Sequence, residues 1–307
     1  MRITTIALLL AISVYGLPAH FGTSPDSPDV ALPVRFGAGP DASDVAMPAR
    51  FGTGVGSAGV VLPAFAGRNF LEYDVRGDGR AVEVVGDLAR ATRIAVLVPG
   101  VDTTLRDFDR GLGGVRRRAP AVQAREIFAA VRAVDPGARV AVVAWLGYDP
   151  PEGLNLESAR DLRARAGAED LISFVRALPA PAAVTLIGHS YGALVIGLAA
   201  PSLPRVADVI ALGAPGMGHN RAADLGGAQV WSALAPTDWI HRIPQARIGH
   251  LGHGRRPSNP RFGAVELPTG GVTGHDGYLS PGSETLEAVA EIVLTPTPPR
   301  RAPGSAL

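Results

Sequence analysis

A serine between two glycines is the residue of this 307-residue chain best suited to chemistry. Residues 188–192 read Gly-His-Ser-Tyr-Gly, after an apolar run at 182–187 and before a run of small apolar residues at 193–200. A strand, a G-x-S-x-G turn and a helix in this order are typical of a nucleophile elbow, whose tight turn exposes the serine hydroxyl. Its flanking positions favour glycine because a Cβ there would strike the strand or the helix. The segment predicts Ser190 as a nucleophile; the alternative is a bystander serine in a glycine-rich turn.

A serine hydroxyl needs an imidazole to take its proton and a carboxylate to orient that imidazole. Asp238 lies just past the second predicted strand after the elbow, at 229–234. His275 lies in a loop that follows a last predicted strand at 262–267. Because the carboxyl ends of parallel strands share one sheet edge, where ligands bind, these residues are expected to meet. Ser190, Asp238 and His275 are therefore the predicted catalytic triad.

Two alternatives to this triad stay open. Asp224 would serve as the acid if its loop folds back toward the elbow. The second alternative is a metal site with His250, His253 and His275 as ligands. Their spacing matches no standard zinc pattern. The triad needs no metal or organic cofactor, and none is expected.

The oxyanion of an acyl-transfer intermediate needs two backbone N–H donors. One is expected from Tyr191, directly after the serine. The other is expected from Val101, in the turn after the predicted strand 94–98, with Gly100 as the neighbouring alternative. Asp149 precedes a proline, so a turn-forming role is its alternative to a place in the pocket. The residues expected around the pocket are Gly100, Asp102, Asp149, His189 and His253.

The rest of the pattern predicts an α/β fold, since strands alternate with helices and so favour a mostly parallel sheet covered on both faces. The helix near 156–177 is either one helix or two joined at Gly167. A β-hairpin is expected at 70–85, further strands at 94–98, 140–146, 182–187, 206–212, 229–234 and 262–267, and helices at 121–134, 156–177, 193–200 and 283–294.

Several short motifs occur together along the chain. Trp-Leu-Gly-Tyr-Asp at 145–149 precedes the Gly-His-Ser-Tyr-Gly segment, and further matches are 213–216, Asp238, 253–254, 262–264, 274–275 and Tyr278. In this combination the chain resembles a bacterial family of uncharacterised α/β-hydrolases, over about residues 68–295. The resemblance implies the α/β-hydrolase fold and a serine nucleophile, and it implies no substrate. Ala214 stands where members of the family often have serine.

The ends of the chain differ in composition from its centre. Residues 1–19 hold one arginine and then an apolar run shorter than the ~20 residues that span a bilayer, which predicts a signal peptide or an N-terminal anchor. Residues 20–67 continue a 15-residue repeat of Pro-x-x-Phe-Gly type with few large apolar side chains, which predicts a disordered linker. The alternative is that the Phe-Gly units bind a partner. Residues 68–295 are expected to form the hydrolase domain and 296–307 a disordered tail.

The composition argues against several classes of function. A net charge of +1 gives no sign of a nucleic-acid partner, and the absence of cysteine excludes a cysteine nucleophile and disulfides. From the triad and the resemblance we expect a serine hydrolase that cleaves an ester of a small-molecule or lipid-like acyl group, with an amide or a thioester as alternatives to the ester. An acyltransferase with the same triad and a catalytically silent binding module are the alternatives. The apolar segment at 1–19 predicts a secreted or envelope-associated protein. The alternative is that this segment anchors the protein in a membrane and so keeps it close to one.

Overall fold

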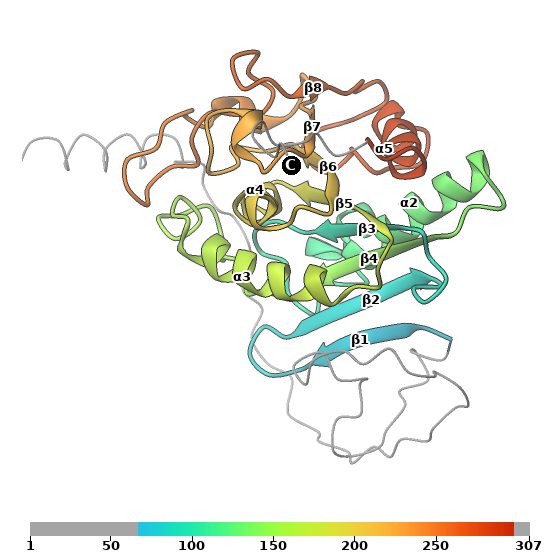
Figure 1. The fold of residues 1–307 in the computed structure, drawn as a ribbon. Helices are drawn as coiled ribbons and strands as arrows, with labels where there is room; N and C mark the ends of the chain where they lie inside the picture. The colour runs from blue at the N-terminus through green and yellow to red at the C-terminus, as the bar shows by residue number, and fades with distance from the viewer. Residues whose placement is uncertain (1–66, 298–307) are drawn as a thin grey trace, which may run out of the picture.

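The computed structural model describes residues 67–297, and in this part of the chain eight strands form one sheet (Figure 1). The strand order is β1-β2-β4-β3-β5-β6-β7-β8. The pairs β1–β2 and β2–β4 are antiparallel, which confirms the hairpin, and all other neighbours are parallel. The strands are β1 (Asn69–Asp74), β2 (Arg80–Gly86), β3 (Arg93–Val98), β4 (Val140–Leu146), β5 (Ala183–His189), β6 (Val206–Leu212), β7 (Gln229–Ala233) and β8 (Val265–Glu266).

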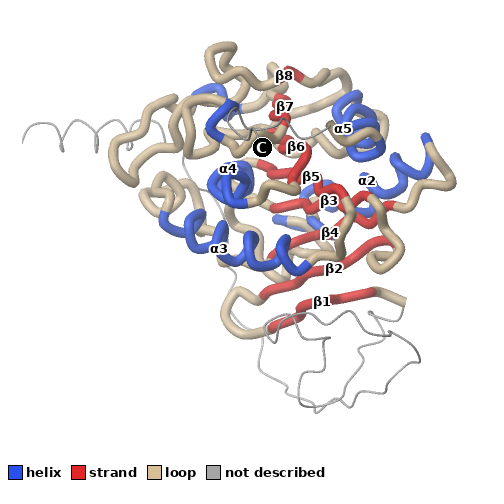
Figure 2. Tube along the Cα trace, in the orientation of Figure 1, coloured by secondary structure: helices blue, strands red, loops and turns tan. Residues whose placement is uncertain are grey.

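Helices cover both faces of this sheet, as predicted (Figures 1 and 2). One pair of helices packs on one face and a second pair on the other, and each pair encloses its own apolar core with the strands. The first pair is α3 (Leu162–Ala177) and α4 (Gly192–Ala199), and the second is α2 (Pro120–Val134) and α5 (Glu284–Leu294).

Strand β3 shows how the sequence produces these two layers. Successive strand residues point to opposite faces of a sheet. Ile94, Val96 and Val98 accordingly pack in the core under α3 and α4, whereas Ala95 and Leu97 pack in the core under α2 and α5. A central parallel strand buried on both faces needs apolar residues at every position, which explains why β3 reads as a continuous apolar run.

Helix α3 begins later than the sequence predicts, at Leu162 and not near 156. The side chain of Asn155 accepts the N–H of Glu157 at 2.8 Å, which turns the chain before the helix. Arg160 then forms an isolated antiparallel bridge with Leu251. The segment before α3 therefore pairs with a distant loop in place of extending the helix.

The last strand is also shorter than predicted, with two residues in β8 against the six at 262–267. Gly263 takes a positive φ of 85°, which leaves the extended conformation. The carbonyl of Phe262 accepts the N–H of Ala222 at 2.7 Å, so it is not available to the sheet. The buried ring of Phe262 packs in the core under α4. Tertiary packing thus outweighs local strand propensity here.

Gly167 lies inside α3 and does not divide it. A Cβ at this position would lie 2.8 Å from Cδ2 of Tyr148, whose buried ring stacks on Trp145 with 5.9 Å between the ring centroids. The missing side chain lets the helix approach the tyrosine closely. Gly167 is therefore a packing residue and not a break between two helices.

The predictions for the two ends of the chain fall outside the described residues. These are the leader or anchor at 1–19, most of the linker at 20–67 and most of the tail at 296–307. Within residues 67–297, no helix has the length and apolarity required to cross a bilayer.

Replacing Gly167 by alanine tests the close packing of α3. Glycine-to-alanine changes inside a helix ordinarily stabilise it by up to about 1 kcal/mol. Here the methyl group would overlap a buried ring, so we expect the free energy of unfolding to fall by about 1–3 kcal/mol in urea titrations. Ser173→Ala, at an exposed position of the same helix, is the control and should change stability by less than about 0.5 kcal/mol. A stabilised Gly167→Ala protein would contradict the packing role.

Candidate active site

The turn after β5 has the geometry of a nucleophile elbow. Ser190 has a φ of 55°, one of only two positive values at non-glycine residues in the described chain, and α4 begins two residues later. A Cβ on Gly188 would lie 2.6 Å from Cα of Ala193, and one on Gly192 would lie 2.2 Å from the carbonyl oxygen of Val98. Both glycines are therefore required by backbone contacts. These close backbone contacts before and after Ser190 hold the serine in its strained conformation.

Asp238 and His275, which lie 37 residues apart in sequence, meet at the carboxyl edge of the sheet. Nδ1 of His275 lies 2.9 Å from both carboxylate oxygens of Asp238. Since a carboxylate only accepts, the ring carries its proton on Nδ1, which leaves the Nε2 lone pair free to act as a base. The aspartate lies just past β7, where its Oδ1 also caps a short 3₁₀ helix (Trp239–Arg242) by accepting the N–H of Ile240 at 2.9 Å.

The environment of Asp238 keeps it charged. Burial by itself raises the pKa of this carboxyl, but hydrogen bonds from His275, Ile240 N–H and Tyr278 hold the pKa below its usual value. The Tyr278 hydroxyl donates to Oδ2 at 2.5 Å and accepts the N–H of Ala235 at 3.1 Å. Sequence reasoning assigned no role to Tyr278, although it belongs to the motif set that carries the family resemblance.

The His275 ring contacts two other aromatic rings. The centroid of its ring lies 4.7 Å from that of His189 and 4.8 Å from that of Trp239. His189 Nε2–H donates to the backbone carbonyl of His275 at 2.7 Å. Burial, together with the adjacent His275 ring, lowers the pKa of His189 to about 4, so it is neutral at pH 7. Trp239 had no role in the sequence analysis; its place directly after Asp238 is the only signal.

Ser190 and His275 line the same cavity, but within residues 67–297 no direct hydrogen bond joins the serine hydroxyl to the ring. Such contacts are often long in unliganded hydrolases and tighten when substrate binds. Ser190 and His275 therefore line one cavity, and Asp238 bonds to the histidine. Their catalytic roles stay predictions.

The candidate oxyanion turn lies directly against the serine. A Cβ on Gly100 would be 2.8 Å from Cβ of Ser190, so only glycine fits between the turn and the elbow. The backbone N–H groups of Tyr191 and Val101 make no hydrogen bond to another backbone group among residues 67–297. The Tyr148 hydroxyl donates to the carbonyl of Pro99 at 2.7 Å, which fixes the turn from behind. Tyr148, a second tyrosine that sequence reasoning gave no role, comes from the Trp-Leu-Gly-Tyr-Asp motif.

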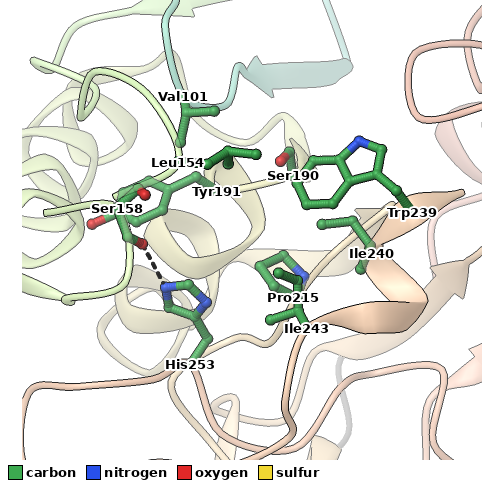
Figure 3. A pocket seen from close by; sticks show the side chains of 10 residues that line it. All are labelled: Val101, Leu154, Ser158, Ser190, Tyr191, Pro215, Trp239, Ile240, Ile243 and His253. Carbon is green, nitrogen blue, oxygen red and sulfur yellow. Dashed lines mark hydrogen bonds between the residues drawn. The ribbon is translucent and has the colours of Figure 1, made fainter. Parts of the chain in front are cut away.

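Two cavities meet at Ser190. The smaller one is mostly apolar, and a water-sized group can occupy only about 20 Å³ of it (Figure 3). Its lining is Val101, Leu154, Ser158, Ser190, Tyr191, Pro215, Trp239, Ile240, Ile243 and His253. The larger one is more polar, and a water-sized group can occupy about 170 Å³ of it. Its lining includes Pro99, Gly100, Val101, Asp102, Arg118, His189, Ser190, Trp239, His275 and Asp276.

Four of the five residues expected around the pocket line one of these cavities. Gly100, Asp102 and His189 line the larger cavity, and His253 lines the smaller one. Asp149 lines neither, because it forms an ion pair with Arg163 in the turn after β4. Its place agrees with the turn-forming alternative.

The geometry supports neither Asp224 as the acid nor the alternative metal site. Asp224 lies in a short 3₁₀ helix (Ala222–Asp224) and pairs with Arg221 at 3.5 Å. His250 bonds a different carboxylate, that of Asp161, at 2.7 Å. No group of three histidine, aspartate, glutamate or cysteine residues within the described range could hold a metal ion.

A family model described as Alpha/beta hydrolase matches residues 74–248. This range begins at the end of β1 and includes the elbow, and the sheet has the mostly parallel order with helices on both faces that the resemblance implies. The chain belongs to this family of α/β-hydrolases.

The chain is also similar in sequence to uncharacterised relatives and in structure to solved hydrolases. The uncharacterised protein Rv2079 of Mycobacterium tuberculosis is 31% identical over 249 residues, covering 70% of this chain and 37% of that protein. Rv0963c of the same organism is 36% identical over 173 residues, covering 52% and 62%. This chain thus spans only part of the length of these relatives. Among solved structures, XC6422 from Xanthomonas campestris is described as a serine hydrolase without lid; it is 16% identical, the match covers 75% of this chain and 97% of that one, and the TM-score is 0.43. Esterase Est22 is 12% identical, the match covers 74% of this chain and 78% of that one, and the TM-score is 0.45.

Removing the hydroxyl of Tyr278 tests its hold on Asp238. The folded-state pKa of Asp238 lies below the unfolded value, so the carboxylate stabilises the fold above about pH 4 and this contribution is lost as pH falls through the folded pKa. Tyr278→Phe should lower the free energy of unfolding at pH 7 by about 1–3 kcal/mol. The difference from wild type should narrow toward pH 3 in urea titrations. A difference in the free energy of unfolding that is independent of pH would mean that the hydroxyl stabilises a group other than the Asp238 carboxylate.

Proposed function

We propose that this chain is a serine hydrolase that cleaves an ester bond with Ser190, His275 and Asp238. The observation that carries the proposal is the pair of 2.9 Å contacts between Asp238 and His275 Nδ1, in a cavity that the ring shares with Ser190. Membership of an α/β-hydrolase family supports hydrolysis as the reaction class. Amides and thioesters of the same acyl groups would react by the same chemistry.

In the proposed reaction, Ser190 Oγ attacks the carbonyl carbon while His275 Nε2 takes its proton. The bond to the leaving alcohol then breaks, and the ring returns the proton to the alcohol. Asp238 stabilises the imidazolium that forms in between. A water molecule, deprotonated by the same ring, attacks the acyl-enzyme, releases the acid and restores the hydroxyl.

The negative oxygen of the intermediate would be held by the backbone N–H groups of Tyr191 and Val101. Both groups lack a backbone acceptor within residues 67–297, and both flank Ser190. Donors that are fixed in advance stabilise developing charge without reorganisation, and each such donor contributes about 3–4 kcal/mol in related sites. The close contact of Gly100 with Ser190 and the hydrogen bond from Tyr148 to Pro99 support this fixed geometry.

Two other functions share this scaffold. An acyltransferase would pass the acyl group to an alcohol in place of water, and product analysis in the presence of a competing alcohol separates the two. A silent binding module would not react at all. The bonded Asp238–His275 pair and the strained Ser190 favour an active site, because an inert site has no need of either.

A fluorophosphonate probe tests the nucleophile. We expect the probe to label the wild-type protein at one site and to leave Ser190→Ala unlabelled, because only an activated serine reacts at an appreciable rate. Labelling is measured by mass spectrometry of the intact protein and of its peptides. Lack of labelling in the wild type, or labelling that persists in Ser190→Ala, would refute the proposal.

Substitution of the acid and the base tests their roles. His275→Ala and Asp238→Asn should each lower turnover of p-nitrophenyl acetate by at least about a thousandfold, as triad substitutions do in other serine hydrolases. Asp224→Asn is the matched control and should keep near-normal activity. If Asp238→Asn retains activity and Asp224→Asn loses it, the role of acid passes to Asp224.

A further inference from the structure

The two cavities at Ser190 differ in their relation to the proposed base. His275 lines the larger cavity and does not line the smaller one. The protonated ring must reach the leaving-group oxygen in order to release it as an alcohol. The leaving group therefore belongs in the larger cavity, which leaves the smaller cavity for the substituent on the acyl carbon.

The smaller cavity admits very little. A water-sized group can occupy only about 20 Å³ of it. This is little more than the space that a single water molecule needs. The wall is mostly apolar and includes Val101, Ile240 and Ile243. A methyl group is the smallest apolar substituent that an acyl carbon can carry, so the cavity matches the acyl part of an acetate ester.

The larger cavity has room for a much bigger group. A water-sized group can occupy about 170 Å³ of it. A cavity of about 150 Å³ holds a benzene molecule. A ring-sized alcohol such as p-nitrophenol therefore fits on the leaving-group side. The two cavities thus accept a sizeable alcohol and restrict the acyl group.

A buried arginine fixes one part of the small cavity's wall, formed by Ile240 and Ile243. Both isoleucine side chains are buried. Nη2 of Arg256, which is 7% exposed, donates to the carbonyl of Ile243 at 2.9 Å. The N–H of Ile243 donates to the carbonyl of Ile240 at 3.0 Å. A shift of this segment that enlarged the cavity would break bonds to a buried cation, which is costly.

Tyr191 and His253 form another part of the wall and are also held by hydrogen bonds (Figure 3). The Tyr191 hydroxyl donates to the carbonyl of Arg160 at 2.8 Å and accepts the N–H of Ala164 at 3.2 Å. His253 Nε2–H donates to the carbonyl of Ser158 at 2.9 Å, and its ring meets Tyr191 edge to face. Buried side chains that are bonded in this way resist expansion, because an oversize group in a close-packed interior forces costly shifts.

We propose that the smaller cavity is an acyl site of two-carbon size and that this protein acts on acetate esters. The proposal rests on the serine-hydrolase function given above, because it concerns the acyl group that Ser190 would bind. The acetyl group passes from the alcohol to Ser190 Oγ and then to water, so acetate is the acid released. Longer acyl chains place their extra methylenes against a wall that does not yield. The volume of the cavity therefore sets the length of the acyl chain.

The chain-length profile of the wild-type protein tests the proposal, because a closed and an open site give opposite trends. In an open apolar cleft each added methylene improves binding by about fourfold. In a filled cavity a methylene too many lowers kcat/KM by about tenfold or more. We expect kcat/KM for p-nitrophenyl butyrate to be at least about tenfold below that for the acetate, after each value is divided by the rate constant of that ester with hydroxide.

The outcomes separate this proposal from the hydrolase function. A flat or rising profile, with hydrolysis lost in Ser190→Ala, would overturn the acyl-size proposal and leave the hydrolase function standing. Absence of hydrolysis of every ester, with Ser190 unlabelled by the probe, would refute both.

Widening the wall tests the assignment of the cavity. Ile243→Ala should raise the ratio of butyrate to acetate turnover by about tenfold or more, through a gain on butyrate. Ile243→Val makes a smaller and milder opening and should raise the ratio of propionate to acetate. Ile248→Ala, at a 65% exposed position that lines neither cavity, is the matched control and should keep the wild-type ratios. Unchanged ratios in every folded Ile243 variant would overturn the assignment.

Discussion

The site depends on the close contact between the elbow and the end of β3. A Cβ on Gly192 would lie 2.2 Å from the carbonyl of Val98, and one on Gly100 would lie 2.8 Å from Cβ of Ser190. No side chain fits between the turn after β3 and the start of α4. The serine and the two candidate oxyanion donors are therefore packed as one unit. The contacts of the turn after β3 with the start of α4 maintain the strained φ of Ser190.

Three buried tyrosines extend this unit to the surrounding loops. Tyr148 donates to the carbonyl of Pro99, Tyr191 to that of Arg160, and Tyr278 to the carboxylate of Asp238. Each ring packs in the apolar interior while its hydroxyl bonds a group in one of the loops around the site. The parallel strands bring the loops to one edge of the sheet, and the hydroxyls set their orientation.

The electrostatics of the site differ between its two sides. Around His275, the charged carboxylate of Asp238 and the neutral ring of His189 suit the proton transfers of the proposed reaction. On the other side the wall is mostly apolar, and burial keeps the imidazole of His253 neutral there.

The sequence by itself determined the strand order along the chain, the elbow at Ser190 and the positions of Asp238 and His275, because glycine spacing and apolar periodicity are local patterns. Only the tertiary structure decided where α3 begins, how short β8 is, that Tyr278 bonds Asp238 and that His253 bonds the carbonyl of Ser158. These features depend on contacts between residues far apart in the chain, such as the bond between His253 and the carbonyl of residue 158. No local period specifies such a contact; the packed fold does.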